Sequence, residues 1–438
     1  MRIRFSYKIK AQNQVLWGFT INMEPRRITS TLLIDDGGII HHGDILLHPD
    51  GSWSKSNGDE DVLETIEGTN RVITRSFQNW HTHLPMMLNR SMGEGLPLME
   101  WLQQSIFPTE KHVTRELIEI GTKAAVAELI ATGTTFACDM YHHPDSIAPI
   151  LADSGIRGIV CGPTTNWPPS PDIEHDDGKV LNKLETLLSD GPLANGRVEY
   201  GIAAHAVYTC SEETLLRAAD LGRRFDAYVH IHTSETRTEV SDCHAIHGMY
   251  PIEYLDSLGF LGNSTVCAHC GWVTKKEMRI LAEKGCHAVH CPISNQKLAC
   301  GGTMSYPAMM DAGVDVRLGT DGAASNNALD MRAEAKSASL IQRHDHWDAT
   351  ILDPIETWTL ATKGSKDWIT WDIDDVRLRP LGINNRRLLA NLIYSGGRCL
   401  DVFVDGRALR RDGTTISIDE RQAYTELETA ARGYYSQI

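Results

Sequence analysis

The chain has 438 residues, of which 42% are hydrophobic, 23% charged and 7% aromatic, a composition that excludes disorder, collagen-like repeats and coiled coil. Its 42 basic and 57 acidic residues give a formal net charge of −15, which disfavours binding to nucleic acid or to an anionic membrane. We expect no membrane-spanning helix, because no run of about 18 apolar residues occurs. The start MRIRFSYKIK lacks the apolar core of a secretion signal, and the ten scattered cysteines are typical of reduced thiols in a cytoplasmic protein.

The pattern of apolar residues divides the chain into three segments. Residues 1–70 contain short runs such as STLLID and GDILLHP between Gly, Asp and Asn, which predicts small β-strands. Residues 71–365 alternate helix-like and strand-like stretches. Residues 366–438 contain RCLDVFVDGRALRRDG, where Asp405-Gly406 predicts a hairpin turn, and a terminal helix. We therefore expect an α/β protein, in which a (β/α)₈ TIM-like barrel lies beside a small β-sandwich domain built from both termini.

A repeating unit within residues 71–365 predicts the barrel. In each unit a helix-like segment ends at a glycine and a strand-like run follows, as with Gly133, Gly155, Gly222, Gly285 and Gly313. The eight runs are 71–80, 134–139, 156–161, 197–206, 223–232, 264–270, 286–291 and 314–321. They are nearly continuously apolar, as expected for parallel strands covered on both faces. Eight such units in about 250 residues are typical of a (β/α)₈ barrel.

Polar side chains stand at the carboxyl ends of these runs. They are His81 and His83, Asp139, Cys161, His205, His232, His269, His290 and Asp321. In a (β/α)₈ barrel these strand ends form the rim that carries the active site. Because five of the runs end in histidine, we infer a catalytic rim rather than isolated structural histidines.

The HxH pair His81 and His83 predicts a metal site. Side chains alternate along a strand, so both imidazoles lie on the same face. His232 ends the fifth run and Asp321 the eighth, which adds a third imidazole and a carboxylate. This donor set suits one divalent ion, Zn²⁺ or else Fe²⁺, with a position left for water whose pKa falls toward about 7. His230 makes a second HxH pair, but it lies further from the rim, and we expect it inside the barrel.

Several segments resemble motifs of the amidohydrolase superfamily, in its cytosine-deaminase-like branch. The segments are NWHTHLPMMLNR (79–90), GLPLMEWLQQSIFPTE (95–110), HTSET (232–236), AHC (268–270), HCPISNQKLACGG (290–302) and LGTDGAASNN (318–327). Within that branch the chain is most similar to methylthioadenosine/S-adenosylhomocysteine deaminases. The resemblance implies a hydrolase that converts an adenosine derivative to the inosine derivative and ammonia. It also implies a small nucleoside as substrate and a homo-oligomer.

The resemblance also implies roles for individual residues. The implied metal ligands are His81, His83, His232 and Asp321. Glu235 is implied as the proton shuttle between water and a ring nitrogen, because a carboxyl group can accept and return a proton. His269 is expected to hydrogen-bond the attacking water oxygen, and Asp321 to pass a proton to the departing amine. Glu110 is implied to hold the ribose hydroxyls, and His205 to lie near the sugar or its 5′ substituent.

Other substrates and functions stay open at this point. Methylthioadenosine, S-adenosylhomocysteine, 5′-deoxyadenosine and adenosine are all candidate substrates, although Cys161-Gly162-Pro163 stands where relatives that bind a homocysteine carboxylate tend to have arginine. A deaminase of guanine, pterin or cytosine and a triazine-type hydrolase are alternatives, and Glu235 favours deamination over the latter. A dihydroorotase-like enzyme would need a lysine in the fourth run, which has none. A non-enzymatic scaffold is a remote alternative.

Overall fold

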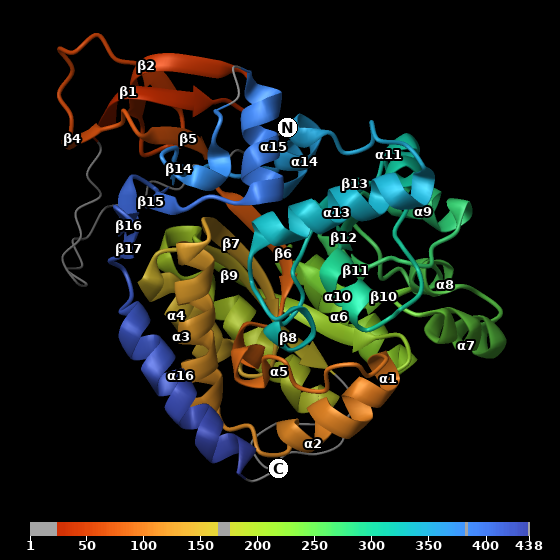
Figure 1. The fold of residues 1–438 in the computed structure, drawn as a ribbon. Coiled ribbons are helices and arrows are strands. Elements are labelled where there is room, and N and C mark those ends of the chain that lie inside the picture. Colours follow the sequence, from red (N-terminus) through yellow and green to blue (C-terminus); the bar gives the residue numbers. More distant parts are fainter. Residues whose placement is uncertain (1–23, 165–175, 382–383, 437–438) are drawn as a thin grey trace, which may run out of the picture.

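A parallel sheet of eight strands forms the centre of the computed structural model, which describes residues 24–164, 176–381 and 384–436 (Figure 1). The strands are β6 (Phe77–Thr82), β7 (Thr134–Met140), β8 (Arg157–Thr164), β9 (Val198–Ala206), β10 (Val229–Thr233), β11 (Thr265–His269), β12 (His287–His290) and β13 (Asp315–Leu318). Each strand pairs in parallel with the next along the chain. After β13 the chain returns to β6, where the Asp321 N–H donates to the His81 carbonyl oxygen at 2.9 Å. The predicted (β/α)₈ barrel is confirmed.

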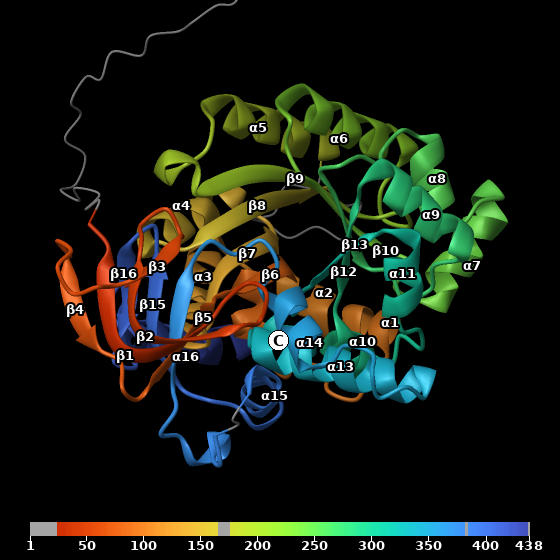
Figure 2. The same ribbon diagram turned by 90° about the horizontal axis from the view of Figure 1, so that it is seen from above.

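Helices follow the barrel strands and cover the outside of the barrel (Figure 2). They are α3 (Arg115–Ala131), α4 (Pro144–Ser154), α5 (Asp177–Asp190), α6 (Glu212–Phe225), α7 (Arg237–His247), α8 (Pro251–Ser257), α9 (Lys275–Lys284), α10 (Pro292–Lys297), α11 (Tyr306–Ala312), α12 (Ala323–Asn326), α13 (Met331–His346) and α14 (Pro354–Thr362), with the short 3₁₀ turn η3 (Ala194–Gly196) before β9. In α3 the Thr114 side chain caps the start by accepting from the Leu117 N–H. Gly133 stops the same segment at φ +85°, a conformation that glycine adopts without strain.

One predicted helix end is wrong. Gly222 lies inside α6, which continues to Phe225 and is closed by Asp226 at φ +51°. The glycine serves close packing instead, because a Cβ at this position would lie 2.3 Å from Val229 Cγ2. The run 223–232 therefore begins inside a helix, and its strand begins only at Val229.

Strands from both ends of the described chain form a second sheet beside the barrel (Figure 1). They are β1 (Arg26–Ile34), β2 (Ile40–Leu47), β3 (Trp53–Lys55), β4 (Glu64–Glu67), β5 (Arg71–Arg75), β14 (Trp368–Asp372), β15 (Cys399–Val404), β16 (Arg407–Arg411) and β17 (Thr414–Thr415). Their order is β17-β16-β15-β14-β5-β1-β2-β3, with β4 beside β1. The predicted hairpin joins β15 to β16, with Asp405 and Gly406 both at positive φ. The sheet domain from both termini is thereby confirmed, whereas its limits at residues 70 and 366 stay predictions.

The sequence predicts residues 71–80 as one barrel strand, but the structure divides them at Ser76. Residues 71–75 form β5, which pairs with β1 and β14 in the terminal sheet, and only Phe77–Thr82 enters the barrel. The Ser76 hydroxyl lies between the hydroxyls of Thr135 and Ser365, at 2.6 and 2.7 Å. Both halves mix apolar and polar residues and are buried apart from Arg75, so the residue pattern alone could not separate them.

An ion pair ties the two sheets together below the barrel. Arg157 begins β8, and its Nη2 and Nε lie 2.9 and 3.0 Å from the two carboxylate oxygens of Asp367, next to β14. Asp367 is fully buried and also accepts a hydrogen bond from the Thr135 hydroxyl at 2.8 Å. This junction holds the barrel and the terminal sheet in a fixed relation.

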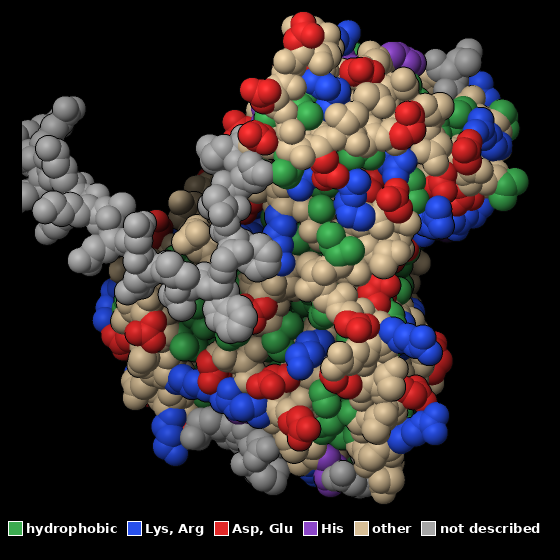
Figure 3. Space-filling view, turned by 90° about the vertical axis from the view of Figure 1, so that its left-hand side faces the viewer, with side chains coloured by type: hydrophobic (Ala, Val, Ile, Leu, Met, Phe, Trp, Pro, Cys, Tyr) green, Lys and Arg blue, Asp and Glu red, His purple; other side chains and the backbone are tan. Residues whose placement is uncertain are grey.

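The surface carries acidic and basic side chains side by side, as the face in Figure 3 shows. On this face the described basic side chains are interspersed with acidic ones rather than gathered into one patch. Within the part of the chain that the structure describes, no helix is long and apolar enough to cross a membrane.

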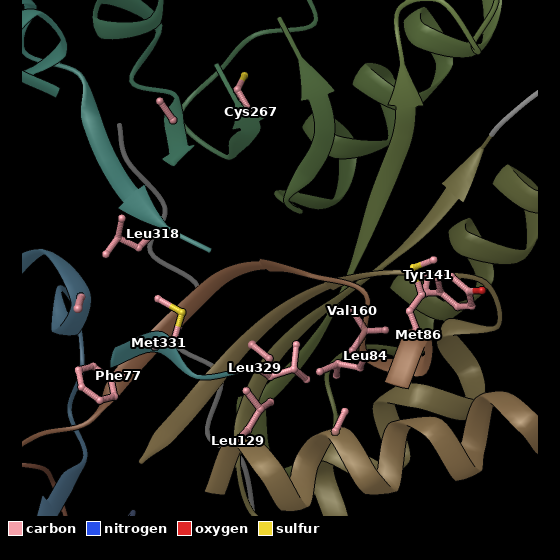
Figure 4. Packing of buried hydrophobic residues seen from close by; sticks show 14 of the residues in the cluster. Phe77, Leu84, Met86, Leu129, Tyr141, Val160, Cys267, Leu318, Leu329 and Met331 are labelled. Carbon is pink, nitrogen blue, oxygen red and sulfur yellow. The ribbon is translucent and has the colours of Figure 1, made fainter. Parts of the chain in front are cut away.

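The long connection from β6 to β7 builds the wall above the barrel. It contains η1 (Leu84–Asn89), α1 (Leu98–Trp101), η2 (Leu102–Ile106) and α2 (Phe107–Glu110) before α3. Leu84 from this connection belongs to the same buried cluster as Leu129 of α3 and Val160 of β8, part of which Figure 4 shows. The terminal helix α16 (Glu420–Tyr435) packs along α3, and the Tyr435 hydroxyl donates to the Leu88 carbonyl. Between β14 and β15 lie η4 (Val376–Leu378) and α15 (Asn385–Ser395).

Candidate active site

Histidines and an aspartate converge at the carboxyl ends of the barrel strands. Ligand atoms of His81, His83 and His232 lie within 4.8 Å of one another, and so do those of His81, His269 and Asp321. The two groups share His81, which is fully buried. The structure therefore brings all the implied ligands into one cluster, together with His269.

The cluster has the donor set of a cation site. Oδ1 of Asp321 lies 3.1 Å from His83 Nε2 and 3.4 Å from His81 Nε2, and His232 Nε2 lies 3.4 Å from His83 Nε2. Among the described residues, His81 Nε2 has no hydrogen-bond partner although it is buried. A buried nitrogen that faces a carboxylate and two further imidazoles fits a divalent ion, which would satisfy all four groups at once.

Outer contacts orient each imidazole. His83 Nδ1 donates to the Met140 carbonyl at 2.5 Å, and His232 Nδ1 donates to the His205 carbonyl at 2.8 Å. His81 Nδ1 lies 3.0 Å from Nε2 of His230. With Nδ1 engaged on the outer side, Nε2 of each ring is directed into the cluster, as in metal centres whose ligands are held by a second layer of hydrogen bonds.

Hydrogen bonds also hold Asp321, the aspartate of the cluster, in place. The hydroxyls of Ser294 and Ser325 donate to Asp321 Oδ2 at 2.6 and 3.0 Å, and the Gly322 N–H donates to Oδ1 at 2.8 Å. Gly319 permits the close approach of this segment to β6, because a Cβ there would lie 2.7 Å from the His81 nitrogen. The carboxylate is thus fixed in place beside the histidines.

The backbone adopts uncommon conformations at these strand ends. His269 has φ +74°, Asp321 has φ +62°, and Ser234, just before Glu235, has φ +52°. Such conformations cost non-glycine residues of order 1–3 kcal/mol and are concentrated at functional sites. Here they turn the chain abruptly out of the strand at three points of the same rim.

Burial and mutual contacts set the protonation of the cluster. Burial lowers the pKa of His81 to about 4 and that of His232 well below its usual value, so these rings are neutral and able to bind metal. Burial alone would lower the pKa of His83, but its contact with Asp321 raises it to about 9. The Asp321 carboxyl in turn has a pKa well below its ordinary value, because the two histidines outweigh its burial.

Glu235 lies beside this cluster. Its Oε2 is 3.7 Å from His269 Nε2, and the thiol of Cys300 donates to its Oε1 at 3.5 Å. Burial raises the pKa of the Glu235 carboxyl, which suits a group that accepts and returns a proton. The turn that presents it is fixed by Glu239, whose carboxylate accepts the N–H groups of Ser234 and Glu235, both at 2.8 Å.

A cavity opens above the cluster. It measures about 760 Å³ including the open space at its mouth. Apolar residues of its wall are Met86, Leu98, Trp101, Leu102, Ile106 and Leu298. Glu110 lines the same cavity and accepts a hydrogen bond from the Tyr141 hydroxyl at 3.0 Å. His205 also lines it, with Nδ1 2.9 Å from the Thr209 hydroxyl. The cavity could hold a flat ring at the cluster and a polar group at Glu110.

Sequence reasoning missed several residues that shape the site. Ser294 and Ser325 hold Asp321, Tyr141 holds Glu110, and Glu239 holds the turn before Glu235. Only Glu239 carried a local signal, since Thr236-x-x-Glu239 is the pattern of a helix start. The predicted rim residue Asp139 has a structural contact, because its Oδ1 accepts the Leu84 N–H at 2.6 Å.

Comparison with known proteins places this geometry in a family. The model of the amidohydrolase family matches residues 72–369. A 5′-deoxyadenosine deaminase of Methanothrix thermoacetophila is 36% identical over 88% of this chain and 94% of its own. A 5-methylthioadenosine/S-adenosylhomocysteine deaminase of Thermococcus kodakarensis is 34% identical over 86% and 94%. The crystal structure of a zinc-bound adenosine deaminase from Xanthomonas campestris superposes with a TM-score of 0.82, at 28% identity over 94% and 98%. The chain therefore belongs to the amidohydrolase family.

Proposed function

We propose that this amidohydrolase removes the exocyclic amino group from the adenine ring of a nucleoside. Water and an adenosine derivative give the inosine derivative and ammonia. The observation that carries the proposal is Glu235, a buried carboxyl group that lines the same cavity as the histidine and aspartate cluster. Relatives at 36% and 34% identity are named as deaminases of such nucleosides, which supports this substrate class.

We assign one divalent ion, Zn²⁺ in the first place and Fe²⁺ as the alternative, to the cluster. The residues that would hold it are His81, His83, His232 and Asp321. When bound, such an ion makes water acidic enough to serve as a nucleophile near neutral pH. The buried, unpartnered Nε2 of His81 and the zinc in the Xanthomonas campestris structure support this assignment.

The protein side chains then move the protons. Glu235 accepts a proton from the attacking water and delivers it to ring nitrogen N1, which makes C6 electrophilic. The water oxygen forms a bond to C6, and His269 is placed to hydrogen-bond it. Asp321 accepts the second proton and passes it to the amino group, so that the C6–N bond breaks and ammonia leaves. Burial of these groups keeps bulk water away from the exchange.

The sugar is recognised at the other end of the cavity. A carboxylate can accept two hydrogen bonds at once, so Glu110 suits the vicinal hydroxyls of ribose. The Tyr141 hydroxyl, which donates to Glu110, holds that carboxylate in position. His205 lines the same cavity with its ring centroid 4.8 Å from that of His232, and there it would contact the sugar or its 5′ substituent.

The test is ammonia release from zinc-loaded protein with adenosine derivatives, guanine, cytosine and a chlorotriazine. We expect the wild type to turn over at least one adenosine derivative. We expect Glu235→Gln to retain the ion but to lose nearly all turnover. Activity on another ring alone would refute the nucleoside assignment, and a Glu235→Gln variant near the wild-type rate would refute the proton shuttle. Matched zinc content in the two proteins is the control.

A further inference from the structure

The three imidazoles of the proposed metal site differ in what their outer nitrogen contacts. Nδ1 of His83 and Nδ1 of His232 each meet a backbone carbonyl, at 2.5 and 2.8 Å. Nδ1 of His81 instead meets Nε2 of another imidazole, that of His230, at 3.0 Å. A carbonyl can only accept, whereas a neutral imidazole nitrogen either donates or accepts. The tautomer of His230 therefore decides which nitrogen of His81 carries its proton.

Only one tautomer of His230 is compatible with metal binding. If His230 Nε2 accepts, His81 carries its proton on Nδ1 and presents the free lone pair of Nε2 to the cluster. The other tautomer of His230 would donate to His81 Nδ1 and leave the proton of His81 on Nε2. That nitrogen lies 3.4 Å from Asp321 Oδ1, so its proton would occupy the place of the ion.

Cys138 supplies the contact that selects the required tautomer. Its sulfur lies 3.5 Å from His230 Nδ1 and can accept the proton that this nitrogen then carries. Cys138, His230 and His81 are all 0% exposed, and Cys138 belongs to an apolar cluster with Ile159 and Ala203. In these surroundings few groups compete for the His230 Nδ1 proton, so even a weak acceptor decides its position.

We propose that His230, with Cys138 behind it, is a positioning residue that keeps His81 in its metal-binding tautomer. The inference rests on the metal site proposed above and adds to it a histidine that does not touch the ion. The same atoms invite a second interpretation, because ligand atoms of Cys138, Cys161 and His230 lie within 4.8 Å and could hold a metal themselves. The hydrogen bond between His230 and His81 favours positioning, because a metal ion on His230 Nδ1 would put the proton on Nε2 and make that nitrogen a donor to His81 Nδ1.

The state of the Cys138 thiol also favours positioning. A hydrogen bond with Cys161, together with burial, holds the pKa of Cys138 well above its ordinary value. A thiol must lose its proton to bind a metal ion, and these surroundings oppose that loss.

The test compares His230→Leu with His230→Gln. Leucine removes the acceptor, whereas the glutamine amide oxygen can still accept from His81 Nδ1. We expect His230→Leu to release Zn²⁺ to an excess of chelator roughly 10–100-fold faster than the wild type, the usual effect of losing such an outer contact. His230→Gln should release it within a few-fold of the wild type. Replacement by Co²⁺ gives a second readout, because its visible absorption reports the geometry of the ligands.

His290→Leu is the matched control, because His290 is also a buried histidine of the barrel and its Nε2 lies 3.5 Å from Gln342. It should release Zn²⁺ at the wild-type rate. If His290→Leu released Zn²⁺ as fast as His230→Leu does, loss of core packing would explain the effect and the proposal would be overturned. The proposal would also be overturned if His230→Leu released Zn²⁺ at the wild-type rate, or if His230→Gln released it as fast as His230→Leu. Two ions per wild-type chain, one of them lost in Cys138→Ser, would overturn it as well. A wild-type protein that binds no ion would instead refute the metal site of the proposed function.

Discussion

The lining of the cavity predicts which 5′ substituents the enzyme accepts. Its described residues include the carboxylates of Glu110, Glu235 and Asp321 but no Lys or Arg. Residues 165–175 lie outside the described residues and contain no Lys or Arg either. S-Adenosylhomocysteine ends in an ammonium and a carboxylate, and the described lining offers this carboxylate no permanent positive charge, because burial lowers the pKa of His205 to about 3 and leaves its ring neutral. Methylthioadenosine and 5′-deoxyadenosine present only uncharged groups to the same wall.

The charge difference sets the expected size of the effect. Leaving a charged group buried without a partner costs about 3–5 kcal/mol. Since about 1.4 kcal/mol corresponds to a factor of ten, the lower end of that range is roughly a 100-fold loss in kcat/KM. A methylthio group instead gains about 0.8 kcal/mol for each carbon that it buries. We therefore expect methylthioadenosine and 5′-deoxyadenosine to exceed S-adenosylhomocysteine by about two orders of magnitude.

The assay measures kcat/KM for deamination from the change in ultraviolet absorption of the purine. 5′-Butylthioadenosine is the control for size, because its tail is long but uncharged. It should react far better than S-adenosylhomocysteine. In the protein, Leu102→Arg should raise kcat/KM for S-adenosylhomocysteine about tenfold, whereas the control Leu102→Met should not. Comparable kcat/KM for S-adenosylhomocysteine and methylthioadenosine would refute the reasoning, and equally poor use of both long tails would show that size rather than charge discriminates.

Three further changes test the site and its scaffold. Glu110→Gln should raise KM for the nucleoside about tenfold with zinc content unchanged, and an unaltered KM would count against the ribose contact. Asp367→Ala removes the buried partner of the Arg157 guanidinium, which then keeps only its ion pair with Asp405, so urea denaturation should report a loss of about 2 kcal/mol. Burial alone would raise the pKa of Asp315, but the hydrogen bond with His287 and the neighbouring cations outweigh it and hold that pKa below its usual value. The Asp315 carboxylate therefore stabilises the fold above pH about 4, and this contribution is lost as the pH falls. Asp315→Asn should therefore be less stable than the wild type at pH 7 and approach it in acid, and a constant difference would contradict the assignment.

The sequence predicted the barrel because each strand is short, apolar and closed by a recognisable turn. Strand boundaries were predicted less well where the same residue pattern fits two different local structures. Residues 71–80 are buried except for Arg75, yet they belong to two sheets, and the contacts of Ser76 mark the division. Gly222 looks like a helix end, but close packing against Val229 accounts for it equally well. Both errors arise because tertiary contacts, which a linear pattern does not contain, decide between two local structures.

The candidate site was predictable where residue type and position determine the chemistry. An HxH pair and polar side chains at successive strand ends must meet at the mouth of a barrel, and the structure brings them together there. The supporting contacts were not predictable, because Ser294, Ser325 and Tyr141 are ordinary residues until the fold places them against Asp321 or Glu110. Such contacts depend on distances across the barrel rather than on spacing along the chain.

The structure separates the chemistry of the site from its substrate selection. The groups proposed to carry the reaction stand at strand ends, where the parallel sheet fixes their positions. Glu110 and the apolar wall other than Leu298 stand on the connection between β6 and β7, whose first short helix, η1, packs against α16. Substitutions in that connection can reshape the cavity without displacing a strand end. A change such as Leu102→Arg should therefore alter the choice of substrate and leave metal binding intact, whereas a change at His230 should do the reverse.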